Sequence, residues 1–250
     1  MSVDKKIDKF ISFFEDQLVA IESMDAPKSI ASHVFDTKLY RIILYVSLMD
    51  CLSGIRYPEL RDSGRHKDKF IKLIDEYSSW DKKDFVSVPI LKERLKFIKG
   101  FTKVKRNIKK ILEQCKGYYG RTIGIDEVDK HIDVFLPLTK NKLELRLLEE
   151  TRHKYLFYKY RNFVIHEFRQ PGYAMGTFGE GSKEPIYHGY IGKNTWVLLY
   201  PVGFFQKVAE CSVCNLKRYF KKNRINPYDH VRRTSDWFDV RDIDKIKRAT

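Results

Sequence analysis

The stretch KLELRLLEETRHKYLFYKYRNFVIHEF, residues Lys142–Phe168, decides the fold class of this chain. Its apolar residues recur at helical spacing, and at about 100° per residue they gather on one face of a helix. In the second half these residues are Leu156, Phe157, Tyr160, Phe163, Val164 and Phe168. The opposite face carries arginine, asparagine and histidine. We therefore expect one long helix whose apolar face packs on a core and whose other face is polar.

Helical patterns also dominate the rest of the chain. Apolar residues repeat every three to four positions in several segments, which is typical of amphipathic helices. A proline opens one of these segments and Gly100 interrupts it, while Gly54 and Pro58 end another. The segments expected to be helical are 4–23, 30–53, 67–77, 89–112 and 201–222.

A β-hairpin is expected ahead of the last helix. The glycine-rich stretch 169–185 predicts a loop, and after it IYHGYI and TWVLLY flank GKN with the alternation and aromatic content of paired strands. The predicted fold is thus all-α, a multi-helix bundle with a small inserted hairpin. Its expected parts are a helical core (1–170), the loop and hairpin (171–200), a final helix packing on the core (201–224) and a basic tail (225–250).

The charge of the chain favours a polyanionic partner. Lys and Arg number 48 against 33 Asp and Glu among 250 residues, which gives a formal net charge of +15. Such a balance suits nucleic acid or an acidic surface, although a lysine-rich composition without any such partner is the alternative reading. The longest apolar run, residues 42–51, is far short of a membrane span, and the first ten residues lack a signal-peptide core. We expect a cytoplasmic protein without membrane contact.

Metal and cofactor chemistry find little support in the sequence. Cys211 and Cys214 form a C-x-x-C, but no second pair completes a zinc site, and in a helix the two would be small buried residues on one face. The chain has no phosphate-binding G-x-x-x-x-G-K-[ST], no H-E-x-x-H and no G-x-S-x-G motif. We therefore expect no metal and no cofactor.

The polar face of residues 142–168 carries the one dense group of chemical side chains. Arg161, Asn162 and His166 form R-N-x-x-x-H near the end of the predicted helix. This pattern resembles the R-x4-6-H signature of HEPN domains, the nucleotide-binding domains of higher eukaryotes and prokaryotes, in which a polar residue also commonly follows the arginine. The helix containing LYVSLMDCLSGIRYP, with an acidic residue near its end, fits the same family. The resemblance extends from about Ile30 to Phe168.

The resemblance implies a function and a role for each residue. Many HEPN domains are ribonucleases of phage defence, toxin–antitoxin or RNA-processing systems that cleave RNA without metal and act as homodimers. By this comparison His166 is the general acid or base, and Arg161 stabilises charge on the phosphate. Asn162 orients the histidine or the phosphate. Asp50 supports the pair by holding the arginine, although pairing with Arg56 is an alternative.

Several cations and one aromatic residue are candidate contacts to RNA. They are Tyr158, Lys159 and Arg169 near the motif, and Arg218, Lys221 and Lys222 on the last helix. The same stripe could instead be a solvated face, with Arg161 paired to Glu167 or to a carboxylate of another helix. Two further functions stay open: a non-catalytic RNA- or nucleotide-binding module, and a scaffold that pairs with an antitoxin or defence protein.

Overall fold

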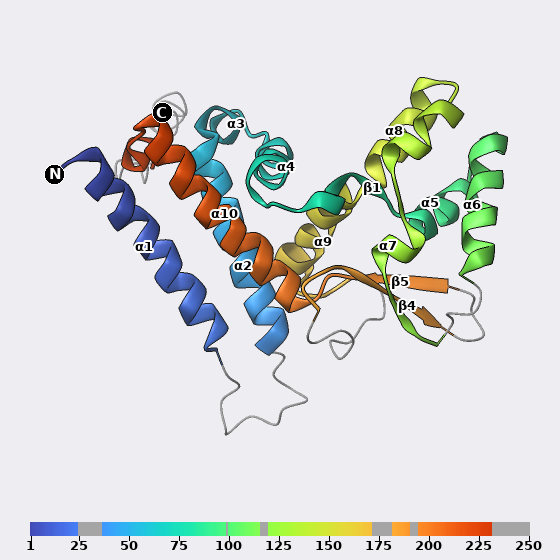
Figure 1. Ribbon diagram of the computed structural model, residues 1–250, viewed down its shortest axis with the longest axis horizontal. Coiled ribbons are helices and arrows are strands. Elements are labelled where there is room, and N and C mark those ends of the chain that lie inside the picture. The colour runs from blue at the N-terminus through green and yellow to red at the C-terminus, as the bar shows by residue number, and fades with distance from the viewer. Residues whose placement is uncertain (25–36, 99, 116–119, 172–181, 191–194, 232–250) are drawn as a thin grey trace, which may run out of the picture.

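The chain folds mainly into helices, with a small amount of antiparallel β-structure ahead of the last helix (Figure 1). The computed structural model describes residues 1–24, 37–98, 100–115, 120–171, 182–190 and 195–231. The expected all-α class with a small β insertion is confirmed. The α-helices are α1 (Val3–Glu22), α2 (Thr37–Arg56), α3 (Pro58–Asp62), α4 (His66–Tyr77), α5 (Val88–Leu95), α6 (Thr102–Gln114), α7 (Ile125–Val128), α8 (Lys142–Glu150), α9 (His153–Glu167) and α10 (Val202–Asn223).

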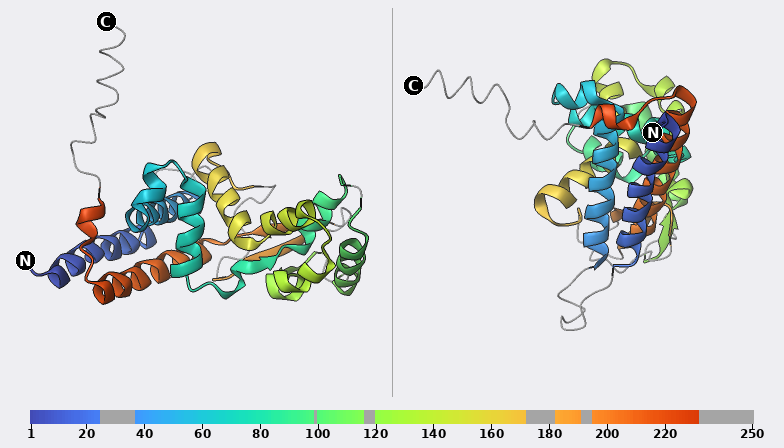
Figure 2. Two further views of the ribbon diagram at one scale, coloured as in Figure 1. Left: turned by 90° about the horizontal axis from the view of Figure 1, so that it is seen from above. Right: turned by 90° about the vertical axis from the view of Figure 1, so that its left-hand side faces the viewer.

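Long helices form one side of the molecule. Helix α10 packs along α1 and α2 and also contacts α4, while α9 packs against α2 and α4. In the right-hand view of Figure 2, α1 and α2 lie side by side and α9 projects beyond α2. Helix α9 is therefore supported by α2 and α4, and its carboxyl end lies at the edge of the molecule.

The expectation of one helix from Lys142 to Phe168 is wrong, because the chain breaks between α8 and α9. Thr151 ends α8, and its carbonyl oxygen accepts a hydrogen bond from the amide of Ser87, 3.0 Å away. Arg152 has an extended backbone and forms a bridge with Val86. Its guanidinium donates to Asp84 at 2.9 Å. These contacts to a distant segment fix the break, which sets the direction of α9 independently of α8.

The hairpin is confirmed, but it belongs to a three-stranded antiparallel sheet. Strand β4 (Ile186–Tyr190) pairs with β5 (Thr195–Leu199), and its other edge pairs with β2 (Thr122–Gly124). A separate pair joins β1 (Phe85–Val86) to β3 (Lys130–His131). The sequence did not predict β1, β2 or β3, since strands of two or three residues have no measurable periodicity.

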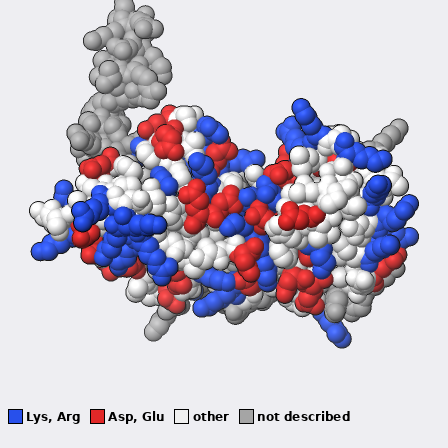
Figure 3. All heavy atoms as spheres, turned by 45° about the horizontal axis from the view of Figure 1, so that its top comes forward, with Lys and Arg blue, Asp and Glu red and all other residues white. Residues whose placement is uncertain are grey.

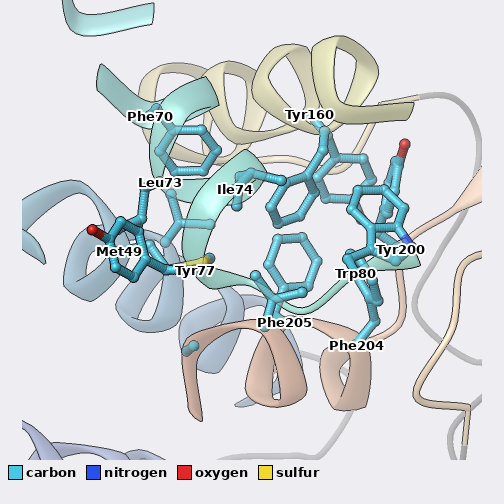
Figure 4. Close-up of a cluster of buried hydrophobic side chains, with 14 of the residues drawn as sticks. Met49, Phe70, Leu73, Ile74, Tyr77, Trp80, Tyr160, Tyr200, Phe204 and Phe205 are labelled. Carbon is cyan, nitrogen blue, oxygen red and sulfur yellow. The ribbon is translucent and has the colours of Figure 1, made fainter. Parts of the chain in front are cut away.

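An aromatic core joins the helices to the sheet (Figure 4). Phe157 of α9 lies 5.1 Å from Phe205 of α10 and 5.8 Å from Phe70 of α4, measured between ring centroids. Trp80 and Tyr200 pack beside them and are almost fully buried. Aromatic side chains bury large apolar areas, and tilted or edge-on ring pairs add further stabilisation. This cluster fixes the inner face of α9.

A buried polar network fixes the start of α9. His153 Nε2 lies 2.6 Å from Asp129 Oδ2, and its Nδ1 lies 3.0 Å from the hydroxyl of Tyr200. Tyr187 donates to the same carboxylate oxygen at 2.9 Å, and its hydroxyl lies 2.6 Å from that of Ser87. Burial raises the pKa of Asp129 and of Tyr187. The hydrogen bonds compensate for the burial of these polar groups. Because the groups come from different elements, the network also connects α9, β4 and the start of α5.

Other expected element boundaries differ in detail. Helix α2 continues through Gly54 to Arg56 and ends before Pro58. The helix expected at 89–112 is two helices, α5 and α6, separated at Gly100 as the sequence suggested. Phe168 does not face the core, since it ends α9 with a left-handed backbone (φ 54°) and is 53% exposed. Residues 172–181 of the loop expected at 169–185, and most of the basic tail, lie outside the described residues.

Candidate functional site

The motif of α9 is built around an ion pair between two helices. Arg161 of α9 donates through Nε to Asp50 Oδ2 of α2 at 2.8 Å, and its Nη2 contacts the same oxygen. The two side chains are only 14% and 17% exposed. Arg56, the alternative partner of Asp50, instead donates to the hydroxyl of Tyr77 at 2.6 Å and lies 3.7 Å from Glu76. Asp50 therefore holds Arg161, and Glu167 pairs with Arg169.

The remaining nitrogen of Arg161 connects Asp50 to the other motif residues. Nη1 donates to the side-chain oxygen of Asn162 at 2.9 Å and lies 3.4 Å from Nε2 of His166. An arginine can only donate, so this contact can be a hydrogen bond only when the Nε2 lone pair of His166 accepts. Although Arg161 and His166 are about 140° apart on the helical wheel, the long arginine side chain brings their nitrogens together. His166 is exposed.

Lys69 of α4 is a member of this cluster that the sequence did not reveal. Its Nζ donates to the backbone oxygen of Asp50 and to Ser53 Oγ, each at 3.1 Å, and lies 3.9 Å from Asp50 Oδ1. The lysine is 7% exposed, and burial lowers its pKa. The acidic residue thus lies between two cations, Arg161 and Lys69. This arrangement fixes the carboxylate and leaves one face of Arg161 directed at His166.

The other expected RNA contacts of α9 lie on two flanks of the helix. Tyr158 packs 5.8 Å from the ring of Phe70 and equally far from the guanidinium carbon of Arg161. Lys159 lies 3.8 Å from Glu150. Arg169 lies 4.8 Å above the Phe163 ring while paired with Glu167. Tyr158 therefore supports the arginine, whereas Lys159 and Arg169 lie on the flank that carries Phe163.

The cations of the last helix are not beside the motif. Lys221 pairs with Asp8 of α1 at 2.7 Å, Arg218 donates to Asn215 at 3.1 Å, and Lys222 is exposed. The carboxyl end of α10 lies next to the amino end of α1, whereas α9 lies in the middle of Figure 1. These three residues do not extend the α9 site directly.

A cationic groove between α5 and α6 is a second surface that the sequence analysis missed. Its floor and sides enclose a volume of about 460 Å³; the floor is formed by Leu95, Ile108 and Leu112, and the sides by Lys92, Lys96, Lys105, Lys109 and one acidic residue, Glu113. Lys and Arg gather at the right-hand edge of Figure 3, the side on which α5 and α6 lie in Figure 1. The first eleven residues of α6 contain five cations and no acidic residue, and this was the signal available in the sequence.

The described residues form neither a metal-binding cluster nor a membrane-spanning helix. No group of three or more His, Cys, Asp or Glu in this part of the chain could hold a metal ion. Cys211 is half-buried and Cys214 is exposed, so the expectation that both are buried is wrong. Among the helices described, none combines the length and the apolar character that a bilayer span requires.

Comparison with known proteins gives no relative from which a function could be transferred. No family model, curated protein or solved structure matches the chain. The chemistry of the site must therefore be argued from its geometry. The cluster presents a fixed guanidinium, a carboxamide and an exposed imidazole within one helical turn and a half, which suits an anionic substrate and one proton transfer.

Proposed function

We propose that this protein is a metal-independent endoribonuclease of the HEPN type. The observation that carries the proposal is the contact between Arg161 and His166, with Nη1 and Nε2 3.4 Å apart, while Asp50 holds the other side of the guanidinium. In phosphodiester cleavage by an adjacent hydroxyl, a fixed cation can stabilise the charge on the phosphate and an exposed imidazole can transfer one proton. The formal charge of +15 supports RNA as the substrate class.

The proposed reaction assigns one step to each group. When Arg161 Nη1 turns from His166 to the phosphate, Nε2 of His166 is free to take the proton of the 2′-hydroxyl, whose oxygen then attacks the adjacent phosphorus. The new 2′-O–P bond forms as the P–O5′ bond breaks, which leaves a 2′,3′-cyclic phosphate, and the protonated His166 of a second copy of the chain delivers a proton to the 5′-oxygen. Arg161 donates to the phosphate oxygens, where negative charge accumulates. Asp50 positions the guanidinium through Nε and Nη2, and Asn162 positions it through Nη1.

We propose that the active form is a homodimer in which two motifs face one cleft. One chain supplies a single imidazole next to Arg161, whereas the reaction needs one proton acceptor and one proton donor. The surface beside His166 is suited to a two-fold contact because it exposes an apolar residue: Phe168, two positions further along the chain, is 53% exposed. Tyr40 packs on Phe168 with the ring centroids 5.3 Å apart, which extends this apolar surface onto α2.

The biological setting is proposed from the family resemblance alone. A nuclease with this motif fits anti-phage defence or a toxin–antitoxin pair acting in the cytoplasm, where a partner protein would restrain it. The chemistry assigned to His166 and Arg161 is the same in either setting.

The experiment is cleavage of a labelled single-stranded RNA in the presence of EDTA. The wild type should cleave it, His166→Ala should lose activity by about 10²-fold or more, and Arg161→Lys should not restore the function of the guanidinium, because an ammonium cannot make two parallel hydrogen bonds. His66→Ala, an exposed histidine at the start of α4, is the matched control and should retain full activity. Loss of all cleavage in EDTA, or equal activity of His166→Ala and the wild type, would contradict the proposal.

A further inference from the structure

An aromatic pocket lies on the flank of α9 next to the motif. Tyr160 and Phe163 of α9, Trp196 and Leu198 of β5, and Tyr200 line a cavity of about 300 Å³. This volume is at the lower end of the range for small-molecule sites, large enough for one flat ring system. Tyr160 and Tyr200 are almost fully buried and form its floor. Phe163 and Trp196 are half-buried, so part of each ring is open to a ligand.

The pocket lies close enough to the motif for one substrate to contact both. Phe163 and His166 are three residues apart on α9, about 60° apart around the axis and about 4.5 Å along it. Side chains at this spacing are neighbours on a helix surface. A substrate whose phosphate contacts Arg161 and His166 can therefore place an adjoining flat group in the pocket without leaving α9.

The pocket combines an apolar lining with cations at its edge. Aromatic side chains line its walls together with aliphatic ones such as Ile90 and Leu156, and the cations nearby lie at its edge: Lys159 lines the pocket, and Arg169 lies 4.8 Å above the Phe163 ring. Lys159 pairs only loosely with Glu150, at 3.8 Å, and burial together with the charge of Arg94 lowers its pKa. Aromatic walls and cations at the rim match a nucleotide, whose base stacks on rings and whose phosphates are anionic.

We propose that this pocket binds one unpaired nucleobase of the RNA, next to the phosphate held by Arg161 and His166. Phe163 and Trp196 stack on the base, while Lys159 and Arg169 contact the phosphates on either side of it. The inference rests on the proposed ribonuclease function for its substrate, and it adds that the substrate is single-stranded at this position. The cationic groove between α5 and α6 has a floor of leucine and isoleucine, which offers no stacking surface, so it does not compete for this role.

The test is a cycle between one protein side chain and one base. Binding of the full chain to a 2′-O-methyl oligonucleotide, which cannot be cleaved, is measured by fluorescence anisotropy at fixed salt. A second oligonucleotide of the same length carries one abasic position, moved along the strand in a series. Trp196→Leu and Phe163→Leu keep the side chains apolar while removing the ring, and Phe13→Leu, which removes a 58% exposed ring from α1, is the matched control.

If the proposal is correct, Trp196→Leu and Phe163→Leu each weaken binding about tenfold, and the abasic site weakens binding to the wild type by a similar factor at one position of the series. When either protein variant is measured on the abasic oligonucleotide, the two losses of binding free energy must not add, because the variant and the abasic site remove the same stacking contact. Phe13→Leu should bind as the wild type does. Additive losses, or wild-type affinity of both variants, would show that the pocket holds no base and receives an apolar side chain of this chain or of a partner.

The outcomes also separate this inference from the proposed function. Non-additive losses of binding without RNA cleavage in EDTA would support the base pocket and contradict the proposed ribonuclease function. Cleavage with additive losses would leave the ribonuclease and overturn the pocket. Failure of the wild type to bind the oligonucleotide at all would overturn the pocket irrespective of cleavage.

Discussion

Replacing Asp50 by asparagine tests whether the carboxylate holds the active arginine. The substitution keeps the shape of the side chain and removes its charge. In the wild type the carboxylate accepts from Arg161 at 2.8 Å and lies 3.9 Å from Lys69 Nζ, so neutralising it leaves two cations facing each other without an anion. The Arg161 and Asp50 side chains are 14% and 17% exposed.

The magnitude follows from this burial. Breaking a fully buried ion pair costs about 3–5 kcal/mol, and an exposed pair about 0–1 kcal/mol. For this largely buried pair we expect Asp50→Asn to lower the free energy of unfolding by about 2–3 kcal/mol, between these two limits. The turnover of RNA should fall about tenfold or more, since the guanidinium is no longer held in one orientation.

The assay is urea unfolding followed by circular dichroism, together with single-turnover cleavage of the same RNA. Asp68→Asn is the control, because Asp68 pairs with Arg65 on the surface and the two side chains are 45% and 61% exposed. It should cost less than about 1 kcal/mol and leave cleavage unchanged. Combining Asp50→Asn with Arg161→Met should cost less than the sum of the single changes. Strict additivity, or wild-type stability of Asp50→Asn, would refute the reasoning.

Three further perturbations address other parts of the site. Burial lowers the pKa of Lys69 below its usual value of about 10.4, so the folded state binds fewer protons at this side chain than the unfolded state does. As the pH rises from the folded pKa of Lys69 toward about 10.4, the free energy of unfolding of the wild type should therefore rise relative to that of Lys69→Met. Urea midpoints of the two proteins that change in parallel across this range would contradict this prediction. Phe168→Asp should convert a dimer to monomer in light scattering without loss of secondary structure, whereas Phe13→Asp, equally exposed on α1, should not. Reversing Lys105 and Lys109 together to Glu should lower the salt dependence of RNA binding by about 1.4 in the log–log slope; an unchanged slope would exclude the α5–α6 groove from the RNA path.

The sequence predicted the helices whose pattern is local and failed where a distant contact decides. Helix α4, expected at 67–77, and α10, expected at 201–222, lie almost where the periodicity predicted them. The break at Thr151 could not be read in the same way, because the apolar spacing continues through it. Hydrogen bonding of that residue to Ser87 and of Arg152 to Asp84 determines it.

The candidate site also has parts that the sequence could predict and parts that depend on distant contacts. Asn162 and His166 lie about one turn apart, so their shared face could be predicted from helical geometry, whereas Arg161 is about 140° from His166 and reaches it only through its long side chain. Which carboxylate holds the arginine could not be predicted, since both Asp50 and Glu167 were within the alternatives. Lys69 had no sequence signal at all, because its burial depends on how α4 packs on α2.

The most direct test of the central claim is the chemical identity of the new 3′ end after RNA cleavage in EDTA. Attack by the 2′-hydroxyl predicts a 2′,3′-cyclic phosphate, and a substrate with a single 2′-deoxy sugar at the cleavage position should resist the enzyme there. With His166→Ala, no 2′,3′-cyclic phosphate should form. A 3′-hydroxyl end, or cleavage of the 2′-deoxy substrate at the wild-type rate, would contradict a ribonuclease built on Arg161 and His166.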